Sequence, residues 1–462
     1  MSERHRRLSF LGLTRRQGLA AAARSWVGGP AAVASAQPRR PPLPRGKPTP
    51  PPPQPPSLPP PEPVALVGGT LIGEDGKALR DAVVVTDDAG RIVFAGPAAS
   101  RPAASPGATP PRTVDVTGQT ITGGLCDPLT QIGIIEVSLE KSTSDRAALD
   151  EEDPIVAAFR AADGYNPASS LVAIARQQGL TSAGVIPGGA GLVTGQSAWV
   201  DLHGTAPDDT LGREVLALHV GIDDGAYGSY RGRRANAWLR LRELIDDTRA
   251  YLKNPAGYDR RQLRTLPHKS RLDLRATARA LRGEVPVVIH VDRASDLLTA
   301  LRVAKAEGLR LVLASAAEGW KVADAIAKAE VPVVVYPLDH GPRSFAALGA
   351  REDNAARLHA AGVRIALSTG SSHDARKLRQ TAGNAVRAGL PQPAGVAAIV
   401  EGPARAFGVD DDYGAPRAGR RANLVVWSGD PLELSSRVVR MFVRGRPASL
   451  RSRQTALFER YR

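Results

Sequence analysis

The chain has 462 residues, which is enough for one large domain or two modest ones. Its formal net charge is +15, but residues 1–63 hold ten Lys and Arg against two Glu and so carry +8 of it, leaving +7 for the rest. Those remaining charges mix with carboxylates and form no sustained basic run, which argues against a nucleic-acid partner. The single cysteine, Cys126, excludes a disulfide within the chain.

The first 36 residues have the pattern of an export signal. The segment 14–19 contains Arg15 and Arg16 of a twin-arginine motif, although Gly18 stands where that motif prefers a bulky apolar residue. A mildly apolar, alanine-rich stretch follows, and residues 34–36 (Ala-Ser-Ala) suit a signal peptidase. We therefore predict a twin-arginine signal over 1–36 and a periplasmic or cell-envelope location; a basic tail without a targeting role is the alternative.

A proline-rich segment comes next. Residues 38–63 contain 15 of the 38 prolines, a composition that favours an extended polyproline-type linker over 37–63. No later segment approaches the ~20 apolar residues of a membrane span. We therefore expect no membrane span after the signal.

Short apolar runs separated by turn residues occur at both ends of the remaining chain. They lie at 64–67, 82–85 and 92–94, and again at 423–427 and 438–443. Neither block can bury both of its faces alone. We predict one small composite β-sandwich built from residues 64–118 and 409–450, followed by a C-terminal tail over 451–462.

Residues 119–408 alternate strand and helix patterns. Continuous apolar runs, which suit parallel strands buried on both faces, lie at 181–186, 215–220, 285–291, 309–315, 331–336 and 363–369. Amphipathic helices are expected near 235–253, around Leu297 with a stop at Gly308, and from Val322 to Ala329. The repeated units favour an α/β fold with a (β/α)8 TIM-like barrel, and a doubly wound sheet is the alternative.

Short motifs in a fixed order connect the chain to a known family. They are Val114–Gly118, Gly124–Asp127, Pro403-Ala404 and Ala422–Trp427. With these motifs the chain resembles the amidohydrolase superfamily, in particular its imidazolonepropionase-like branch, over about residues 64–450. The resemblance implies a barrel with its chemistry at the C-terminal strand ends, and hydrolysis of carbon–nitrogen bonds other than peptide bonds.

The resemblance also implies one or two divalent metals, such as zinc. Family enzymes hold them with a His-x-His pair after strand one, histidines after strands five and six, and an aspartate after strand eight. This chain has Leu129 and Gln131 at the first pair, and Ser315 and Gly370 at the last two positions. Only His290 matches the strand-five histidine. One matched imidazole falls short of the three protein ligands of a catalytic zinc site, so we predict an eroded metal site.

Other polar residues lie near the same strand ends. Asp292, two residues beyond His290, is the expected catalytic partner of that histidine if the site is active. His340, His373 and Gln131 are candidates for substrate or ligand binding, and Asp127 can converge with them. The alternatives are that His340 and His373 are loop or capping residues and that His290 is a hydrogen-bonded core histidine.

Two further motifs are candidate sites. The glycine-rich segment 188–195 lacks the Gly-Lys-Ser/Thr ending of a phosphate-binding loop, which favours a flexible loop at a strand end. Cys126 lies in an apolar strand without a paired histidine, which favours a small core residue over a nucleophile.

Three functions remain open. We favour a non-catalytic amidohydrolase-like protein that binds a small ligand or a partner at the barrel mouth. The alternative is an active hydrolase with a relocated mononuclear metal, or a metal-free site, around His290. A purely structural envelope protein rests on the proline-rich linker alone. A homodimer is compatible with barrels of this type.

Overall fold

The computed structural model describes residues 58–103, 109–147, 153–189, 191–222, 234–260 and 270–462. The predicted export signal (1–36) and most of the predicted proline-rich linker (37–63) lie outside these residues. The last residues of that linker contact the strands at the C-terminal end. Arg446 Nε donates to Pro59 O at 2.7 Å, and Glu62 N donates to Gly445 O at 3.3 Å.

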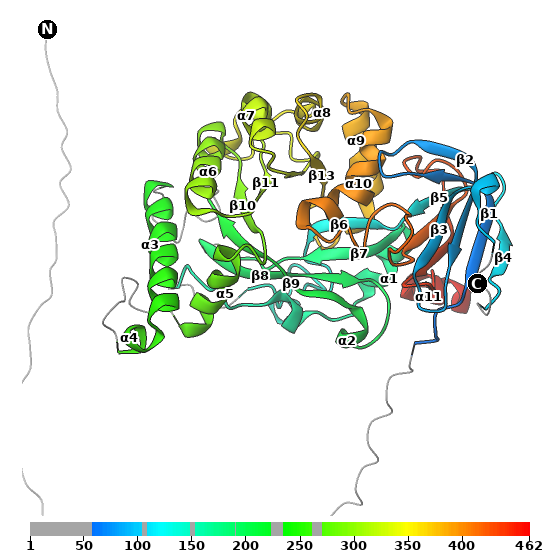
Figure 1. Cartoon of the computed structure of the whole chain (residues 1–462), viewed down its shortest axis with the longest axis horizontal. Coiled ribbons are helices and arrows are strands. Elements are labelled where there is room, and N and C mark those ends of the chain that lie inside the picture. Colours follow the sequence, from blue (N-terminus) through cyan, green and yellow to red (C-terminus); the bar gives the residue numbers. More distant parts are fainter. Residues whose placement is uncertain (1–57, 104–108, 148–152, 190, 223–233, 261–269) are drawn as a thin grey trace, which may run out of the picture. The chain divides into compact units, whose positions relative to one another are not determined.

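Sixteen strands and eleven α-helices make up the described residues (Figure 1). The strands are β1 (Val64–Ile72), β2 (Ala78–Thr86), β3 (Ile92–Pro97), β4 (Arg112–Asp115), β5 (Thr120–Gly123), β6 (Leu125–Thr130), β7 (Leu180–Val185), β8 (Val193–Asp201), β9 (Leu211–Gly221), β10 (Val287–Val291), β11 (Leu311–Ser315), β12 (Val333–Val335), β13 (Ile365–Leu367), β14 (Leu424–Trp427), β15 (Val438–Val443) and β16 (Arg446–Pro447). The helices are α1 (Ser170–Gln177), α2 (Pro207–Thr210), α3 (Arg234–Lys253), α4 (Pro255–Asp259), α5 (Arg271–Leu281), α6 (Ala294–Glu307), α7 (Ala323–Lys328), α8 (Asn354–Ala360), α9 (Leu378–Arg387), α10 (Gln392–Phe407) and α11 (Arg453–Tyr461).

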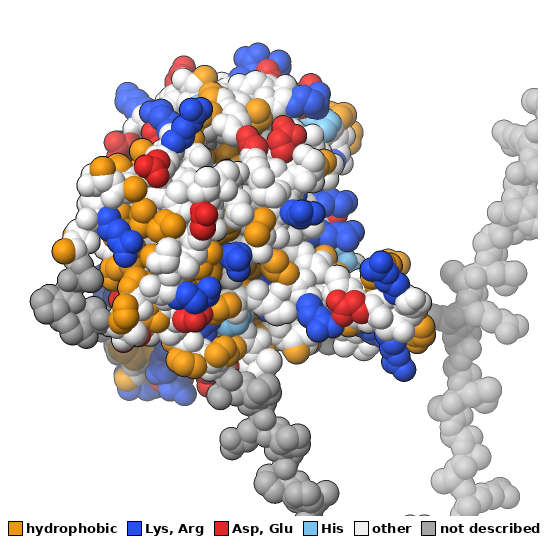
Figure 2. All heavy atoms as spheres, turned by 90° about the vertical axis from the view of Figure 1, so that its right-hand side faces the viewer, with side chains coloured by type: hydrophobic (Ala, Val, Ile, Leu, Met, Phe, Trp, Pro, Cys, Tyr) orange, Lys and Arg blue, Asp and Glu red, His pale blue; other side chains and the backbone are white. Residues whose placement is uncertain are grey.

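The two ends of the chain share one sheet. Its strand order is β16-β15-β14-β5-β1-β2-β3, with β4 paired to β1, so β14 from the C-terminal part lies directly against β5. This confirms that both ends contribute to one β unit, whereas the two-layered sandwich stays a prediction. On the face in Figure 2, basic and acidic side chains are interspersed, as in an ordinary solvated surface.

The central part forms a second eight-stranded sheet in sequential order, β6 to β13, which excludes the doubly wound alternative. All neighbouring pairs are parallel except those of β8, which runs antiparallel to both β7 and β9. The regular (β/α)8 repeat expected from the sequence is therefore broken here. Few residues connect β7 to β8 and β8 to β9, and a parallel crossover needs a dozen or more. The segment 188–195, expected to be a loop, contains the first residues of β8.

The barrel sheet is nearly closed, because side chains connect its first and last strands. The carboxylate of Asp127 in β6 accepts hydrogen bonds from Ser368 Oγ (2.5 Å) and Thr369 Oγ1 (2.5 Å), just beyond β13. Thr130 Oγ1 donates to Ser371 O at 2.9 Å. The interior of the barrel is packed with side chains from most of its strands, including Cys126, Leu129, Val288, Val312 and Ala366. Cys126 is thus a buried core residue, as expected.

The predicted helices also form. Helix α3 matches the 235–253 expectation, and α6 ends where expected, with Gly308 in the left-handed conformation (φ 70°) at its C-cap. The residues predicted as a C-terminal tail contain α11, which has no buried residue. Within the described part of the chain, no helix is both long and apolar enough to cross a membrane.

Candidate functional site

Leu129, near the end of β6, and Gln131, just after it, stand at the positions of the expected His-x-His pair. Leu129 is fully buried and belongs to the packed interior of the barrel. Gln131 follows the strand and lies against the glycine-rich loop, since a Cβ on Gly188 would come within 2.4 Å of Gln131 Nε2. Leu129 thus packs in the core and Gln131 contacts a loop, at the two positions that the sequence resemblance assigns to the first metal-binding pair.

Two histidines meet on the neighbouring strands β9 and β10. His219 Nδ1 lies 3.0 Å from His290 Nε2, and the two rings are tilted by 35°. His219 is fully buried, and its Nε2 has no hydrogen-bond partner among the described residues. Burial, followed by the proximity of His290, holds the pKa of His219 well below its ordinary value. A neutral His219 can thus share one N–H···N bond with His290.

A second polar cluster follows β10 and β11. Buried Asp292 accepts from Ser315 Oγ (2.5 Å), from the backbone N of Ala317 (3.2 Å) and from Arg343 Nη2 (2.9 Å). Arg343 also donates to Ser315 Oγ at 2.8 Å and pairs with Asp339. These bonds direct the Asp292 carboxylate toward β11 and Arg343. The expected partnership of Asp292 with His290 stays a prediction.

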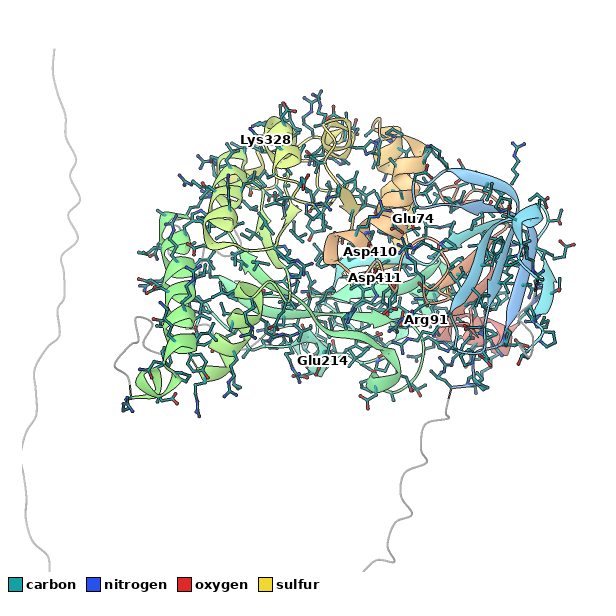
Figure 3. The ribbon with its side chains drawn as sticks, viewed as in Figure 1. Glu74, Arg91, Glu214, Lys328, Asp410 and Asp411 are labelled. Carbon is teal, nitrogen blue, oxygen red and sulfur yellow. The ribbon has the colours of Figure 1, made fainter. Side chains whose placement is uncertain are left out.

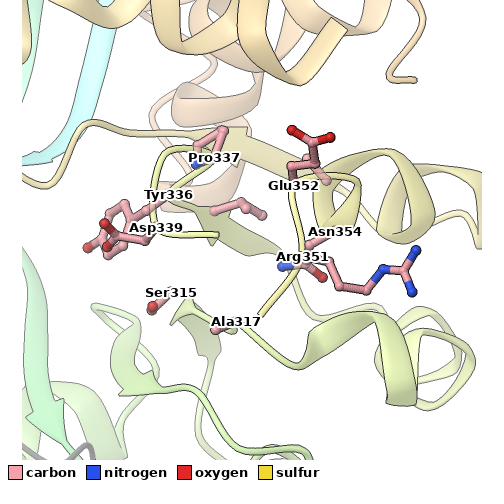
Figure 4. A pocket seen from close by; sticks show the side chains of 10 residues that line it. Ser315, Ala317, Tyr336, Pro337, Asp339, Arg351, Glu352 and Asn354 are labelled. Carbon is pink, nitrogen blue, oxygen red and sulfur yellow. The ribbon is translucent and has the colours of Figure 1, made fainter. Parts of the chain in front are cut away.

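The backbone at Ser315 is strained. Ser315 and Ala316 have φ values of 72° and 49°, in the left-handed region that non-glycine residues rarely adopt. Figure 4 shows Ser315, Tyr336 and Asp339 around a cavity of about 10 Å³, room for about one water molecule. The Ser315 hydroxyl, at the position that the resemblance assigns to the strand-six ligand, is thus held in place by Asp292 and Arg343.

Asp127 and Tyr336 are further titratable groups near the strand ends. Burial raises the pKa of Asp127, despite the hydrogen bonds from Ser368 and Thr369. Burial, and then the negative charges of Asp127 and Asp339, raises the pKa of Tyr336. The Tyr336 ring lies next to Gly370, the strand-eight position, with a Cβ there coming within 3.4 Å of the ring.

His340 and His373 are the other two histidines predicted for the site. His340 is exposed, and its Nδ1 lies 3.2 Å from Pro337 O, as in a loop residue. His373 is half-buried near Glu136. Burial opposes the ionisation of Glu136, but hydrogen bonds from Ser169 and Ser170, with a smaller contribution from His373, hold its pKa below the ordinary value.

A pocket of about 370 Å³ adjoins the segment that follows β6. Its lining includes Glu136, Thr143, Asp145, Asn166 and Ser169. An ionised Glu136 and an exposed Asp145 give it a negative character. Its size falls within the usual range for small-molecule sites.

The metals that the family fold implies can be compared with these side chains. No group of three or more His, Cys, Asp or Glu in the described ranges is arranged to hold a metal ion. The histidine pair supplies two of the three protein ligands that a catalytic zinc site uses. Among the residues that the structure describes, the donor set does not fit the metal.

Sequence reasoning found His290, Asp292 and Ser315 but not the partners that surround them. His219 is not among the predicted residues, although its position near the end of a strand adjacent to β10 is the signal that predicts contact. Arg343 and Asp339 lie in an irregular loop, where periodicity carries no information. Ser368 and Thr369 bond to Asp127 from the other end of the barrel sheet, a contact that no local sequence pattern indicates.

Comparisons with known proteins agree with this architecture. Residues 268–450 match the model of the amidohydrolase family. A search of curated proteins finds no match. The superfamily-level resemblance expected from the sequence is therefore supported, while its imidazolonepropionase-like branch stays a prediction.

Solved structures share the fold. An amidohydrolase from Thermotoga maritima MSB8 is 24% identical, covers 84% of this chain and 100% of its own, and has a TM-score of 0.74. A putative prolidase from Bifidobacterium longum is 16% identical, covers 87% and 100%, and has a TM-score of 0.51. Phenylurea hydrolase B is 15% identical, covers 84% and 97%, and also has a TM-score of 0.51. At these identities the likeness extends to the fold alone.

Proposed function

We propose that the protein is a non-hydrolytic amidohydrolase-like protein that binds a small ligand near the C-terminal strand ends of its barrel. The observation that carries this proposal is the fate of the family's ligand positions. Leu129 packs in the barrel interior, Ser315 is bonded to Asp292 and Arg343, and Gly370 has no side chain to offer. Chemistry that needs a metal at these positions lacks its ligands.

The pocket beside β6 supports the binding half of the proposal. Its carboxylates, Glu136 and Asp145, favour a small ligand that carries an amine or amidine group. Because Glu136 is held by the serines that begin α1, it is a fixed charge rather than a mobile one. Asp145 is exposed, so its carboxylate is accessible to a ligand.

Metal analysis tests the non-hydrolytic half. We expect the purified wild-type protein, and the His290→Ala and His219→Ala variants, to contain far less than one zinc, nickel, manganese or iron per chain. Near-stoichiometric metal that is lost in both histidine variants would overturn the proposal.

Calorimetric titration with putrescine, a small diamine, tests the binding half. We expect saturable binding to the wild type that Asp145→Asn weakens by roughly fivefold or more, since a charged contact is lost. The matched control is Glu433→Gln, an exposed carboxylate in the loop between β14 and β15. Equal weakening in the control would assign the effect to net charge and contradict this pocket.

The second candidate function is an active hydrolase of carbon–nitrogen bonds around His290. One observation favours it: the 3.0 Å between His219 Nδ1 and His290 Nε2 is also close to the spacing of two adjacent ligands on one zinc ion at about 2.0–2.1 Å each. Metal retention that depends on both histidines, together with amide hydrolysis that chelation abolishes, would select this function.

We further propose that the chain is exported through its twin-arginine segment. Arg15, Arg16 and the small residues at 34–36 support this proposal. Replacing Arg15 and Arg16 with Lys should abolish translocation, as measured by fractionation of cells that express the full chain. Continued export of the variant would exclude the twin-arginine route.

A further inference from the structure

A groove of about 910 Å³ lies at the end of the barrel opposite His290. Its lining comes from the residues that precede β10 to β13 and from the final turns of α6, α7 and α10. Because β10 to β13 run parallel, their N-terminal ends face away from the strand ends that carry the histidine pair. The groove is therefore separate from the candidate site described above.

The floor of this groove is apolar. Leu301, Leu309 and Val331 are half-buried there, beside the buried Leu311 and Pro286. Such a floor offers an apolar surface that an elongated hydrocarbon group can cover. The size of the groove suits a small organic ligand.

The rim is strongly basic. It carries five exposed cations, which have no carboxylate partner among the described residues: Arg302, Lys305, Arg310, Lys328 and Arg364. Glu330 is the one carboxylate in the lining. A sixth cation, Arg405, is already paired with Glu401 and Glu74. Figure 3 labels Lys328 at the helices α6 and α7, away from the acidic residues Asp410 and Asp411.

Two of the arginines are held by backbone carbonyls. Arg310 Nη1 donates to Gly283 O at 3.1 Å, and Arg364 Nη2 donates to Glu330 O. Lys305 and Lys328 lie in the last turns of α6 and α7, where cations commonly offset the helix dipole. That explanation does not apply to Arg310 and Arg364, which precede strands β11 and β13. Each guanidinium retains further N–H donors for an anion.

We propose that this groove binds an amphiphilic organic phosphate, with its hydrocarbon part on the floor and its phosphate on Arg310 and Arg364. Planar guanidinium groups bind phosphate oxygens in pairs, and several cations in one groove add a long-range attraction for anions. The apolar floor accounts for the hydrocarbon part, which a site for inorganic phosphate would not need.

Dodecyl phosphate, below its micelle concentration, is the probe for a calorimetric titration of the full-length protein. We expect one saturable site, whose affinity falls with added salt because the rim charges are exposed. Inorganic phosphate and dodecanol should each bind at least about tenfold more weakly, since each lacks one half of the recognition. Equal binding of dodecanol would overturn the role of the cations, and equal binding of inorganic phosphate would overturn the role of the floor.

The double variant Arg310→Glu/Arg364→Glu should lose roughly tenfold or more of the affinity for dodecyl phosphate. Its control is Arg213→Glu/Arg440→Glu, which makes the same change in net charge at exposed positions on β9 and β15. A second variant, Ala329→Glu, adds a carboxylate to the groove without removing any side chain. Unchanged affinity in both groove variants, with folding verified by circular dichroism, would overturn the proposal.

Discussion

At the scale of single residues, buried polar groups are bonded mainly to neighbours that pack the fold. Asp127, Asp292 and Glu401 are carboxylates with little or no exposure, and each has donors from other segments of the chain. Hydrogen bonds that stabilise the fold thus engage these buried carboxylates, the kind of group that serves as acid or base in a catalytic site. His219 is one of the exceptions, because its Nε2 is buried without a described partner.

The lowered pKa of His219 implies that the folded protein loses stability in mild acid. Its folded pKa lies well below the ordinary value of 6.5, so only the unfolded chain takes up its proton as the pH falls below about 6.5. His219→Asn keeps a side-chain N–H near the Nδ1 position and removes this titration. Between pH 6.5 and 5.5, the wild type should lose up to about 1.4 kcal/mol more unfolding free energy than the variant. Urea unfolding at each pH measures this, and parallel pH profiles would contradict it.

Removing the charge of Asp201, at the end of β8, should lower the unfolding free energy strongly. It accepts from Arg444 Nε (2.5 Å), Asn423 Nδ2 (2.8 Å) and Tyr413 OH (3.0 Å), and so joins the barrel to the C-terminal strands. Asp201→Ala leaves these donors without their acceptor and should cost about 3–5 kcal/mol of unfolding free energy. Chemical denaturation measures the loss. Asp208→Ala, which removes an exposed carboxylate in α2, should change stability by less than about 0.5 kcal/mol.

At the scale of elements, the order of strands was predictable and the direction of one strand was not. The six apolar runs became β7, β9, β10, β11, β12 and β13, because continuous burial leaves an unambiguous pattern. Strand β8 was missed because its first residues, Val193–Gly195, belong to a segment read as a glycine-rich loop. The short connections on both sides of it, which make it antiparallel, become meaningful only once the strand itself is known.

Gly179, in the turn between α1 and β7, has no room for a side chain. Gly179 has φ +90°, and a Cβ there would come within 2.2 Å of Trp427 in β14. Gly179→Ala therefore adds a clash to backbone strain and should cost more than about 3 kcal/mol. Gly362→Ala is the matched control, since it has φ +84° with nothing within 4 Å, and should cost about 1–2 kcal/mol. Thermal unfolding compares the two, and equal losses would show that packing against Trp427 contributes nothing.

At the scale of the whole molecule, strands from the N-terminal and C-terminal parts of the described chain share one sheet. Strand β14 lies between β5 and β15, so the C-terminal strands cover an edge that the N-terminal strands would otherwise expose. Trp427 in β14 is fully buried, donates from Nε1 to Thr122 Oγ1 at 2.9 Å and lies under Arg379. The N-terminal strands and the barrel are therefore expected to fold together with β14 and β15.

Two truncations test this dependence. A chain that ends at residue 422 loses β14 to β16 and should give no cooperative thermal transition. A chain that ends at residue 452 loses only α11, which has no buried residue, and should melt within a few degrees of the full chain. A cooperative transition in the shorter chain would contradict the shared sheet.

The sequence by itself determined the alternation of strands and helices and the pairing of the two ends into one β unit, and it placed Leu129, Ser315 and Gly370 at motif positions where the resemblance implies metal ligands. These features depend on local periodicity and on residue identity at motif positions, which a single sequence displays directly. Only the tertiary structure decided that β8 runs antiparallel, that His219 contacts His290, and that Arg343 reaches Asp292 from a distant loop. Those contacts join residues far apart in the chain, and their geometry depends on how the strands pack rather than on any local pattern.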